Sequence, residues 1–431
     1  MKRNSKSTKK VRNLVIVCTL TAILLTVSTY AWFIGMQTVK VNQFEIEIAG
    51  VDSLLLSMDG ATWSTTVTPG TTAAYENNTN QFLTEDGEGL IPMSSVGDIE
   101  LTTSRMKLFQ KGSLTATTGG YRLMASLVDN NEALKVGDDT IPGQYKESEG
   151  YVAFDLFVMN LSGEAYYNEI TTPSNEEAIY LTYESKVEAA GNGAEVSGID
   201  NSVRVAFAQI GRVDAEYGYK PEKTATITGI TCNLDDGAPA YTESNGVTGI
   251  CRDAHIWEPN EKDHVANALT WYKKSCKPRT SDKTKFAYDT GSCKDIDGIH
   301  YKTAAVKNVI MANNYIDVYD GELNGHEIDT DYLEEVDTIT DYEKLLIGAD
   351  RKEIMTLAPN SITKVRVYIW LEGQDVDNFD FASLGEKITV SFGFTKERYT
   401  TEEIQNPGQE IVVPGGINNE SKPTNPSTPT E

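Results

Sequence analysis

The chain has 431 residues, of which 63 are acidic and 38 are basic, so its formal net charge is −25 at pH 7. So acidic a surface repels nucleic acid and anionic lipid, which excludes nucleic acid as a partner. The length allows a large core and more than one domain, and the many Thr, Gly, Asn, Val and Tyr residues favour a mainly β protein with many turns.

The N-terminal segment has the pattern of an export signal. Residues 14–33 carry no charge, six basic residues precede them, and no acidic residue occurs before Glu45. A basic flank before an apolar run is held in the cytoplasm while the chain that follows crosses the membrane during export. We therefore predict an extracellular or cell-surface protein. Removing residues 1–31 takes away six basic residues and no acidic one, which brings the formal charge near −31.

The end of this segment permits two fates. Residues 14–28 have the length of a signal-peptide core, and Thr29 and Ala31 are small enough for positions −3 and −1 of a cleavage site. Cleavage after Ala31 would leave Trp32 as the new N-terminus, and we predict this outcome. The alternative is an uncleaved anchor over residues 14–34, which is just long enough to cross a bilayer.

The first exported segment is predicted to be a β-strand. Over residues 38–50, apolar and polar residues alternate with a break in phase near Asn42, which indicates a β-bulge. The apolar positions of this strand are Val39, Val41, Phe44, Ile46 and Ile48.

Four later segments have strand patterns, at residues 151–160, 201–210, 361–373 and 388–394. The first is apolar on both faces, which predicts a central strand covered on both sides. In the second, Arg204 interrupts an otherwise apolar face, so we expect its side chain to face outward. Trp370, within the third, is expected in the core.

Residues 211–345 differ in composition and are predicted to be an insertion into one sheet system, with residues 32–210 before it and 346–397 after it. Short helices are predicted over residues 261–274 and 331–346. Residues 398–431 are rich in Pro, Thr and Asn and are expected to be disordered.

The cysteines support this division. Cys18 lies in the signal segment, and an even number in an exported region indicates two disulfides that staple the insertion. A zinc site is the alternative, but no C-x-x-C pair is present. The four candidate cysteines are Cys232, Cys251, Cys276 and Cys293.

Residues 28–33, S-T-Y-A-W-F, resemble the signal-peptide end of the TasA/camelysin-type biofilm matrix and surface proteins of Gram-positive bacteria. In that family a dedicated signal peptidase cuts after an alanine that precedes an aromatic pair, and a strand then leads into an antiparallel jelly-roll-like β-sandwich. The blocks at residues 151–160, 198–207 and 363–377 are similar to those of exported clostridial proteins with the same signal ending. The resemblance implies adhesion or fibre assembly.

In such assemblies the N-terminal strand can be donated to the open sheet edge of another copy or of a related matrix subunit. An edge strand exposes unpaired amides and carbonyls, which another chain can satisfy. The donor here would be the strand at residues 38–50. The alternative is that this strand pairs inside its own sandwich, as most strands do.

Catalytic motifs are not evident. The four histidines form no H-E-x-x-H pattern, and no G-x-S-x-G or phosphate loop occurs, so we predict no enzyme and in particular no protease. His264 is expected to be a surface residue of a short helix. A secreted hydrolase with a site in residues 211–345, dependent on His264 or Glu258, is an alternative function.

Acidic residues offer one candidate ligand set. Glu372, Asp375 and Asp377 follow directly after a predicted strand, and clustered carboxylates at a strand end can bind calcium. The simpler interpretation is a solvated acidic turn, and no other cofactor is predicted. A membrane-anchored, calcium-stabilised surface binding module is therefore another alternative to a structural matrix protein.

Overall fold

A computed structural model describes the part of the chain that carries the strands. The described residues are 40–48, 53–69, 89–100, 103–115, 121–128, 133–136, 139–145, 147–148, 150–161, 166, 176–190, 198–215, 224, 227, 243–244, 247–250, 252–261, 263–266, 268, 304–307, 333–346, 348–373, 375, 377–378 and 387–396. The predicted signal segment, the four candidate disulfide cysteines and residues 398–431 lie outside them.

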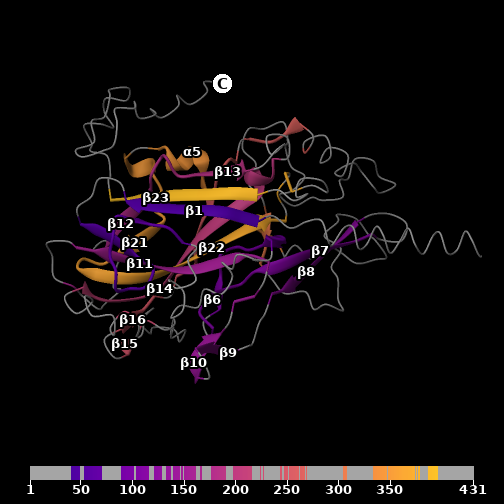
Figure 1. The fold of residues 1–431 in the computed structure, drawn as a ribbon. Helices are drawn as coiled ribbons and strands as arrows, with labels where there is room; N and C mark the ends of the chain where they lie inside the picture. The colour runs from indigo at the N-terminus through magenta and orange to yellow at the C-terminus, as the bar shows by residue number, and fades with distance from the viewer. Residues whose placement is uncertain are drawn as a thin grey trace, which may run out of the picture.

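The fold is mainly β, as predicted, and consists of two large sheets with smaller two-stranded pieces (Figure 1). The first sheet has six strands in the order β21-β12-β23-β1-β3, and β13 also pairs with β23. Its strands are β1 (Lys40–Ile48), β3 (Thr66–Val67), β12 (Glu177–Leu181), β13 (Lys186–Ala190), β21 (Met355–Leu357) and β23 (Lys387–Thr395).

The second sheet has eleven strands and is centred on β22 (Ser361–Glu372). Antiparallel neighbours flank β22 on both sides, β11 (Val152–Asn160) on one and β14 (Val203–Asp214) on the other. The remaining strands are β2 (Leu54–Ser57), β4 (Pro92–Ser94), β7 (Phe109–Thr115), β8 (Tyr121–Leu127), β15 (Glu243–Ser244), β16 (Val247–Gly249), β17 (His255–Glu258) and β20 (Ile339–Thr340).

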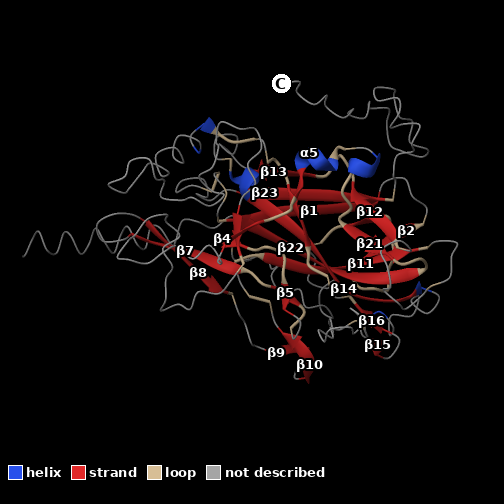
Figure 2. Ribbon diagram, turned by 180° about the vertical axis from the view of Figure 1, so that it is seen from behind, coloured by secondary structure: helices blue, strands red, loops and turns tan. Residues whose placement is uncertain are grey.

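Small elements complete the described structure. The two-stranded pieces are β5 (Ile99–Glu100) with β6 (Arg105–Met106), β9 (Ala133–Val136) with β10 (Asp139–Tyr145), and β18 (Ala304–Val306) with β19 (Leu333–Glu335). The helical turns are η4 (Ile199–Ser202), α5 (Asp341–Lys344) and η7 (Gly348–Asp350). They are short, as Figure 2 shows in blue.

The two predicted helices are only partly present. Thr340 and Glu343 form a capping box at the start of α5, which satisfies the first backbone amides of that single turn. The rest of residues 333–346 contains the strands β19 and β20 rather than helix. Over residues 261–274, Ala266 and Ala268 are helical, and the segment from 269 lies outside the described residues.

The two large sheets share a buried apolar core. Val152, Phe154, Leu156 and Val158 alternate along β11 and face this core, as do the equivalent positions of β14 and β22. The first sheet contributes Phe392 and Phe394, and their rings lie 5.3 and 5.7 Å from that of Phe207 in near-perpendicular orientations. Edge-to-face contacts of this kind stabilise a core beyond the area that they bury.

The opposite face of the second sheet is buried as well. Ala153, Phe157 and Met159 of β11 pack there with Tyr368 and Trp370 of β22 in a second apolar cluster. The prediction that β11 is a central strand covered on both sides is confirmed, and Trp370 is fully buried.

β1 is a partner of the last strand. It runs parallel to β23 from the Lys40–Lys387 pair to the Ile48–Phe394 pair, and Figure 1 shows the two strands side by side. The register shifts between Val41 and Gln43, which confirms the predicted bulge. Ile46 has no exposed surface. β1 is thus paired within its own sheet, the alternative that the sequence left open.

Most of the described strand pairs are antiparallel, as predicted, but three are not. β1 with β23, β4 with β22, and β20 with β17 are parallel pairs, so both large sheets are mixed.

No helix within the described residues is long and apolar enough to cross a bilayer.

Candidate functional site

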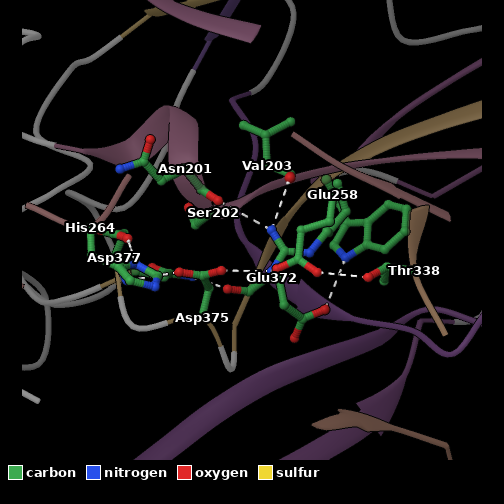
Figure 3. Close-up of polar contacts among 12 residues, drawn as sticks. Asn201, Ser202, Val203, Glu258, His264, Thr338, Glu372, Asp375 and Asp377 are labelled. Atoms are coloured by element: carbon green, nitrogen blue, oxygen red, sulfur yellow. Dashed lines mark hydrogen bonds and ion pairs between the residues drawn. The ribbon is translucent and has the colours of Figure 1, made fainter. Parts of the chain in front are cut away.

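A cluster of buried charged side chains lies where β14 begins and where β17 and β22 end. Arg204 is directly opposite Trp370 of β22, and Trp257 is directly opposite Val205, so Glu258 follows on the other side of β14. The loop after β22 brings Asp375 and Asp377 to the same place (Figure 3). We call Arg204, Glu258, His264, Glu372, Asp375 and Asp377 the acidic network.

Arg204 is the centre of the acidic network. Its Nη2 atom lies 2.6 Å from a carboxylate oxygen of Glu258 and 2.6 Å from one of Asp375, and Nη1 donates to two backbone carbonyls. Only 2% of the side chain is exposed, so the expectation that Arg204 faces outward is wrong. Burial alone would lower the pKa of Arg204, but Glu258 and Asp375 raise it above its ordinary value.

Glu258 is held from a second side by Thr338, whose hydroxyl donates to the other carboxylate oxygen at 2.8 Å. Burial raises the pKa of Glu258, and the charge of Arg204 opposes that rise. Glu372 faces Trp370, and the indole Nε1 donates to its carboxylate at 3.3 Å.

Asp377 and His264 form the end of the acidic network opposite Glu258. Nδ1 of His264 lies 2.5 Å from Asp377 Oδ2, and the backbone N–H of Val265 donates to Oδ1 at 3.0 Å. The backbone N–H of Asp377 donates to Asp375 Oδ1 at 2.8 Å, which links the two halves of the network. The expectation that His264 is a surface residue of a helix is wrong, because 19% of its side chain is exposed and it precedes the helical residues.

Burial, hydrogen bonding and a neighbouring charge shift the pKa values of this pair. Desolvation raises the pKa of Asp377 to about 6, although the hydrogen bond from His264 opposes the rise. Burial would lower the pKa of His264, but the hydrogen bond to Asp377 and the charge of Asp375 raise it. The pair therefore holds on to protons at pH values where an exposed Asp and His would release them.

The acidic network contains more carboxylates than cations. Among the residues that the structure describes, Glu258, Glu372, Asp375 and Asp377 face one arginine and one histidine. Two other buried clusters differ: Asp155 and Glu147 balance Lys364 and Arg366, and Glu176 lies between Arg212 and Arg252. Excess negative charge inside a protein favours a bound cation or a retained proton.

His264, Asp375 and Asp377 could hold a metal ion, because one ligand atom of each lies within 4.8 Å of the others. Two of the three residues predicted as calcium ligands are in this group, whereas Glu372 bonds Trp370 instead. Calcium takes oxygen ligands, while an imidazole nitrogen with carboxylates suits zinc, manganese or iron. The donor set therefore fits a transition metal better than the predicted calcium.

The His264–Asp377 pair also has the geometry of a base with its orienting carboxylate. A nucleophile would have to contact Nε2 of the ring. Ser202 and Thr338, the hydroxyls drawn in Figure 3, donate instead to Ile199 O and Glu258. Among the described residues, Asp377 is the hydrogen-bond partner of the ring.

Several predicted site residues are not placed here. Those outside the described residues are Thr29, Ala31, Trp32, Val39, Cys232, Cys251, Cys276 and Cys293. Of the predicted donor residues, Val41, Phe44, Ile46 and Ile48 lie on β1. Known proteins add nothing to these assignments, since no protein-family model, curated protein or solved structure matches the chain.

Proposed function

We propose that this chain is an exported structural or adhesive protein of the cell surface or extracellular matrix, and that copies assemble by exchanging β1. The observation that carries the proposal is the place of β1 in the first sheet. It covers β23 along eight paired positions, yet it meets β3 at only two. Its main attachment is therefore to a single strand.

An identical strand from a second copy satisfies the same positions. If β1 leaves, β23 exposes the backbone groups of residues 387–394 and the core loses Ile46. An unpaired edge of this length is a template for another chain. Because β1 ends at Ile48 and β2 begins at Leu54 in the other sheet, the intervening residues are the hinge about which exchange would occur.

This proposal includes the export signal, cleavage after Ala31 and the jelly-roll arrangement implied by the family resemblance. The acidic composition supports it, since a strongly charged surface keeps an exported chain soluble until specific edges pair. The proposal does not require catalysis.

A disulfide trap tests the exchange. Glu45 of β1 and Ser391 of β23 are register partners, and neighbouring strands place α-carbons within disulfide range. Mixing the variant Glu45→Cys with the variant Ser391→Cys under oxidation should yield a covalent heterodimer only if β1 of one chain pairs with β23 of another.

The matched control replaces Ser391→Cys by Thr395→Cys, which is off the register of Glu45. Peptide mapping by mass spectrometry separates the engineered disulfide from bonds of the native cysteines. Two results together would contradict strand exchange. The yield of the covalent heterodimer would equal that of the control pair, and electron micrographs would show the same assembly after deletion of residues 32–48.

The His264–Asp377 pair favours a hydrolase as the second candidate function. A secreted hydrolase using this pair should lose activity in His264→Ala and keep its fold. A panel of ester, peptide and glycoside substrates with both proteins would decide, and equal activity of the two counts against it.

A further inference from the structure

A groove of about 520 Å³ lies beside the acidic network, and segments distant in the sequence form it. Its lining comes from residues 96–98, 253–256, 334–339 and 352–353. Ile256 and Val336 separate it from a cavity of about 10 Å³, lined partly by Arg204 and Glu372. The groove has the volume of a small-molecule or side-chain binding site.

The rim of the groove is acidic. Its five carboxylates belong to Asp98, Asp253, Glu334, Asp337 and Glu353. Its lining also includes two basic side chains, Lys352 and His255. Lys352 is already neutralised, because its Nζ atom lies 2.7 Å from Asp337 and 3.0 Å from Glu343.

Two other lysines approach the rim from outside. Lys107 is 3.9 Å from Asp98 and Lys307 is 3.5 Å from Glu334, both in exposed positions where ion pairs are weak. Within the described part of the chain, no cation pairs with Asp253 or Glu353, and both side chains are exposed. The groove therefore keeps a net negative charge after its own lysines are counted.

The floor of the groove is apolar. Val96, Ile256 and Ile339 are among the aliphatic residues of the lining, and Ile256 and Ile339 are almost completely buried, in contrast to the exposed Asp253 and Glu353. At the rim, His255 Nδ1 lies 3.0 Å from the backbone carbonyl of Glu353. A carbonyl oxygen only accepts, so Nδ1 carries the hydrogen and Nε2 of the neutral ring can accept from a ligand.

We propose that this groove binds a lysine- or arginine-containing peptide segment of a partner protein. Long basic side chains combine an aliphatic stem, which matches the floor, with a charged end, which matches the rim. Lys352 shows that two carboxylates of this region can hold one ammonium group. The proposal is independent of strand exchange, because no residue of β1 lines the groove.

The state of Asp253 agrees with a missing cation. Partial burial and the neighbouring Asp98 raise its pKa above the ordinary value, although Lys107 and His255 oppose the rise. A positive charge brought near Asp253 would relieve both costs.

The test is fluorescence anisotropy with the purified full chain and a labelled peptide, Gly-Arg-Lys-Gly-Arg-Lys-Gly, at low and at physiological salt. The peptide should bind with one-to-one stoichiometry and weaken with salt. The variant Asp253→Asn/Glu353→Gln should raise its Kd by roughly 3- to 10-fold, the effect of two exposed charge pairs.

The matched control is Glu184→Gln/Glu188→Gln. It makes the same change in net charge with two exposed residues that do not line the groove. Its Kd should equal that of the unmodified chain. Equal weakening in both variants would show general charge attraction and overturn the proposal, as would equal binding of a peptide with Gln in place of Arg and Lys. Tighter binding of spermine or calcium than of the peptide would also overturn it.

Discussion

Asp155 and Arg366 lie directly opposite each other on β11 and β22, and Arg366 Nε is 2.7 Å from Asp155 Oδ1. Neither side chain is more than 3% exposed. Lys364 adds a second cation 2.9 Å from the other carboxylate oxygen. Glu147 is the second carboxylate of this cluster, 3.3 Å from Arg366 Nη1, so two carboxylates balance two cations in the middle of the second sheet.

Asp155→Asn should destabilise the fold by about 3–5 kcal/mol, because Lys364 would lose its carboxylate partner and Arg366 would keep the longer contact with Glu147. The free energy of unfolding, measured by urea denaturation, checks this. Removing charge from all four positions of the cluster with Asp155→Leu, Glu147→Gln, Lys364→Met and Arg366→Met should recover much of the loss. A single variant as stable as the unmodified chain would contradict the assignment.

The same aspartate predicts a pH dependence. Burial would raise the pKa of Asp155, but Arg366 and Lys364 hold it well below its ordinary value near 3.8. Because the folded-state pKa is the lower one, the stabilisation is complete above the unfolded-state pKa and is lost as the pH falls below it. Between pH 5 and pH 3 the free energy of unfolding of the unmodified chain should fall by about 1 kcal/mol more than that of Asp155→Asn. An equal fall in the free energy of unfolding of the two proteins over this pH range would refute the assignment.

In the acidic network, Arg204→Met should lower the free energy of unfolding by about 3–5 kcal/mol, since Glu258 and Asp375 would lose their shared counter-charge. Arg204→Lys keeps the charge but not the forked geometry, so its loss should be smaller. Adding Glu258→Gln and Asp375→Asn to Arg204→Met should restore stability in part. Thermal unfolding of the four proteins measures each step, and an unaltered Tm in Arg204→Met would be the contrary result.

For the predicted cation site, zinc or manganese should raise the Tm of the full chain more than calcium does, because His264 offers nitrogen. Saturation at about 100 times the Kd corresponds to roughly 2.7 kcal/mol of stabilisation. His264→Ala should remove the shift, and Asp263→Asn, an exposed neighbour, should not. If no divalent ion changes Tm, the network holds protons rather than a metal.

Shortening the buried side chain of Ile46 on β1 should lower the stability of the fold. Ile46→Ala should cost about 2–5 kcal/mol, because the side chain is fully buried in the core between the sheets. Val67→Ala on β3, a partly buried neighbour of that core, should cost less. Guanidinium denaturation compares them, and equal losses would mean that β1 is not anchored by its own core contact.

The strands were the most predictable part of the fold. The alternation in β11, β14 and β22 identifies the apolar residues that face the core, since a period of two follows directly from strand geometry. The bulge near Asn42 was visible for the same reason, as a break in that period.

The buried charges could not be predicted. Arg204 and Arg366 alternate with valines, which is also the pattern of a strand with one solvated face. Their partners Glu258 and Glu147 come from distant segments that cover the face, and no local pattern marks such a pairing. Asp375 and Asp377 were found because they follow a strong strand. His264 was missed as their neighbour, since only the fold brings residues 264 and 377 together.

The parallel pairing of β1 with β23 constrains the order in which the chain can fold. Its first described strand hydrogen-bonds to its last, so the sheet cannot close until residue 395 has been synthesised. Pairing between such remote segments is intrinsically slow. If the chain is exported as we propose, this topology would keep its first sheet incomplete during passage through the membrane and let the sheet close only on the far side.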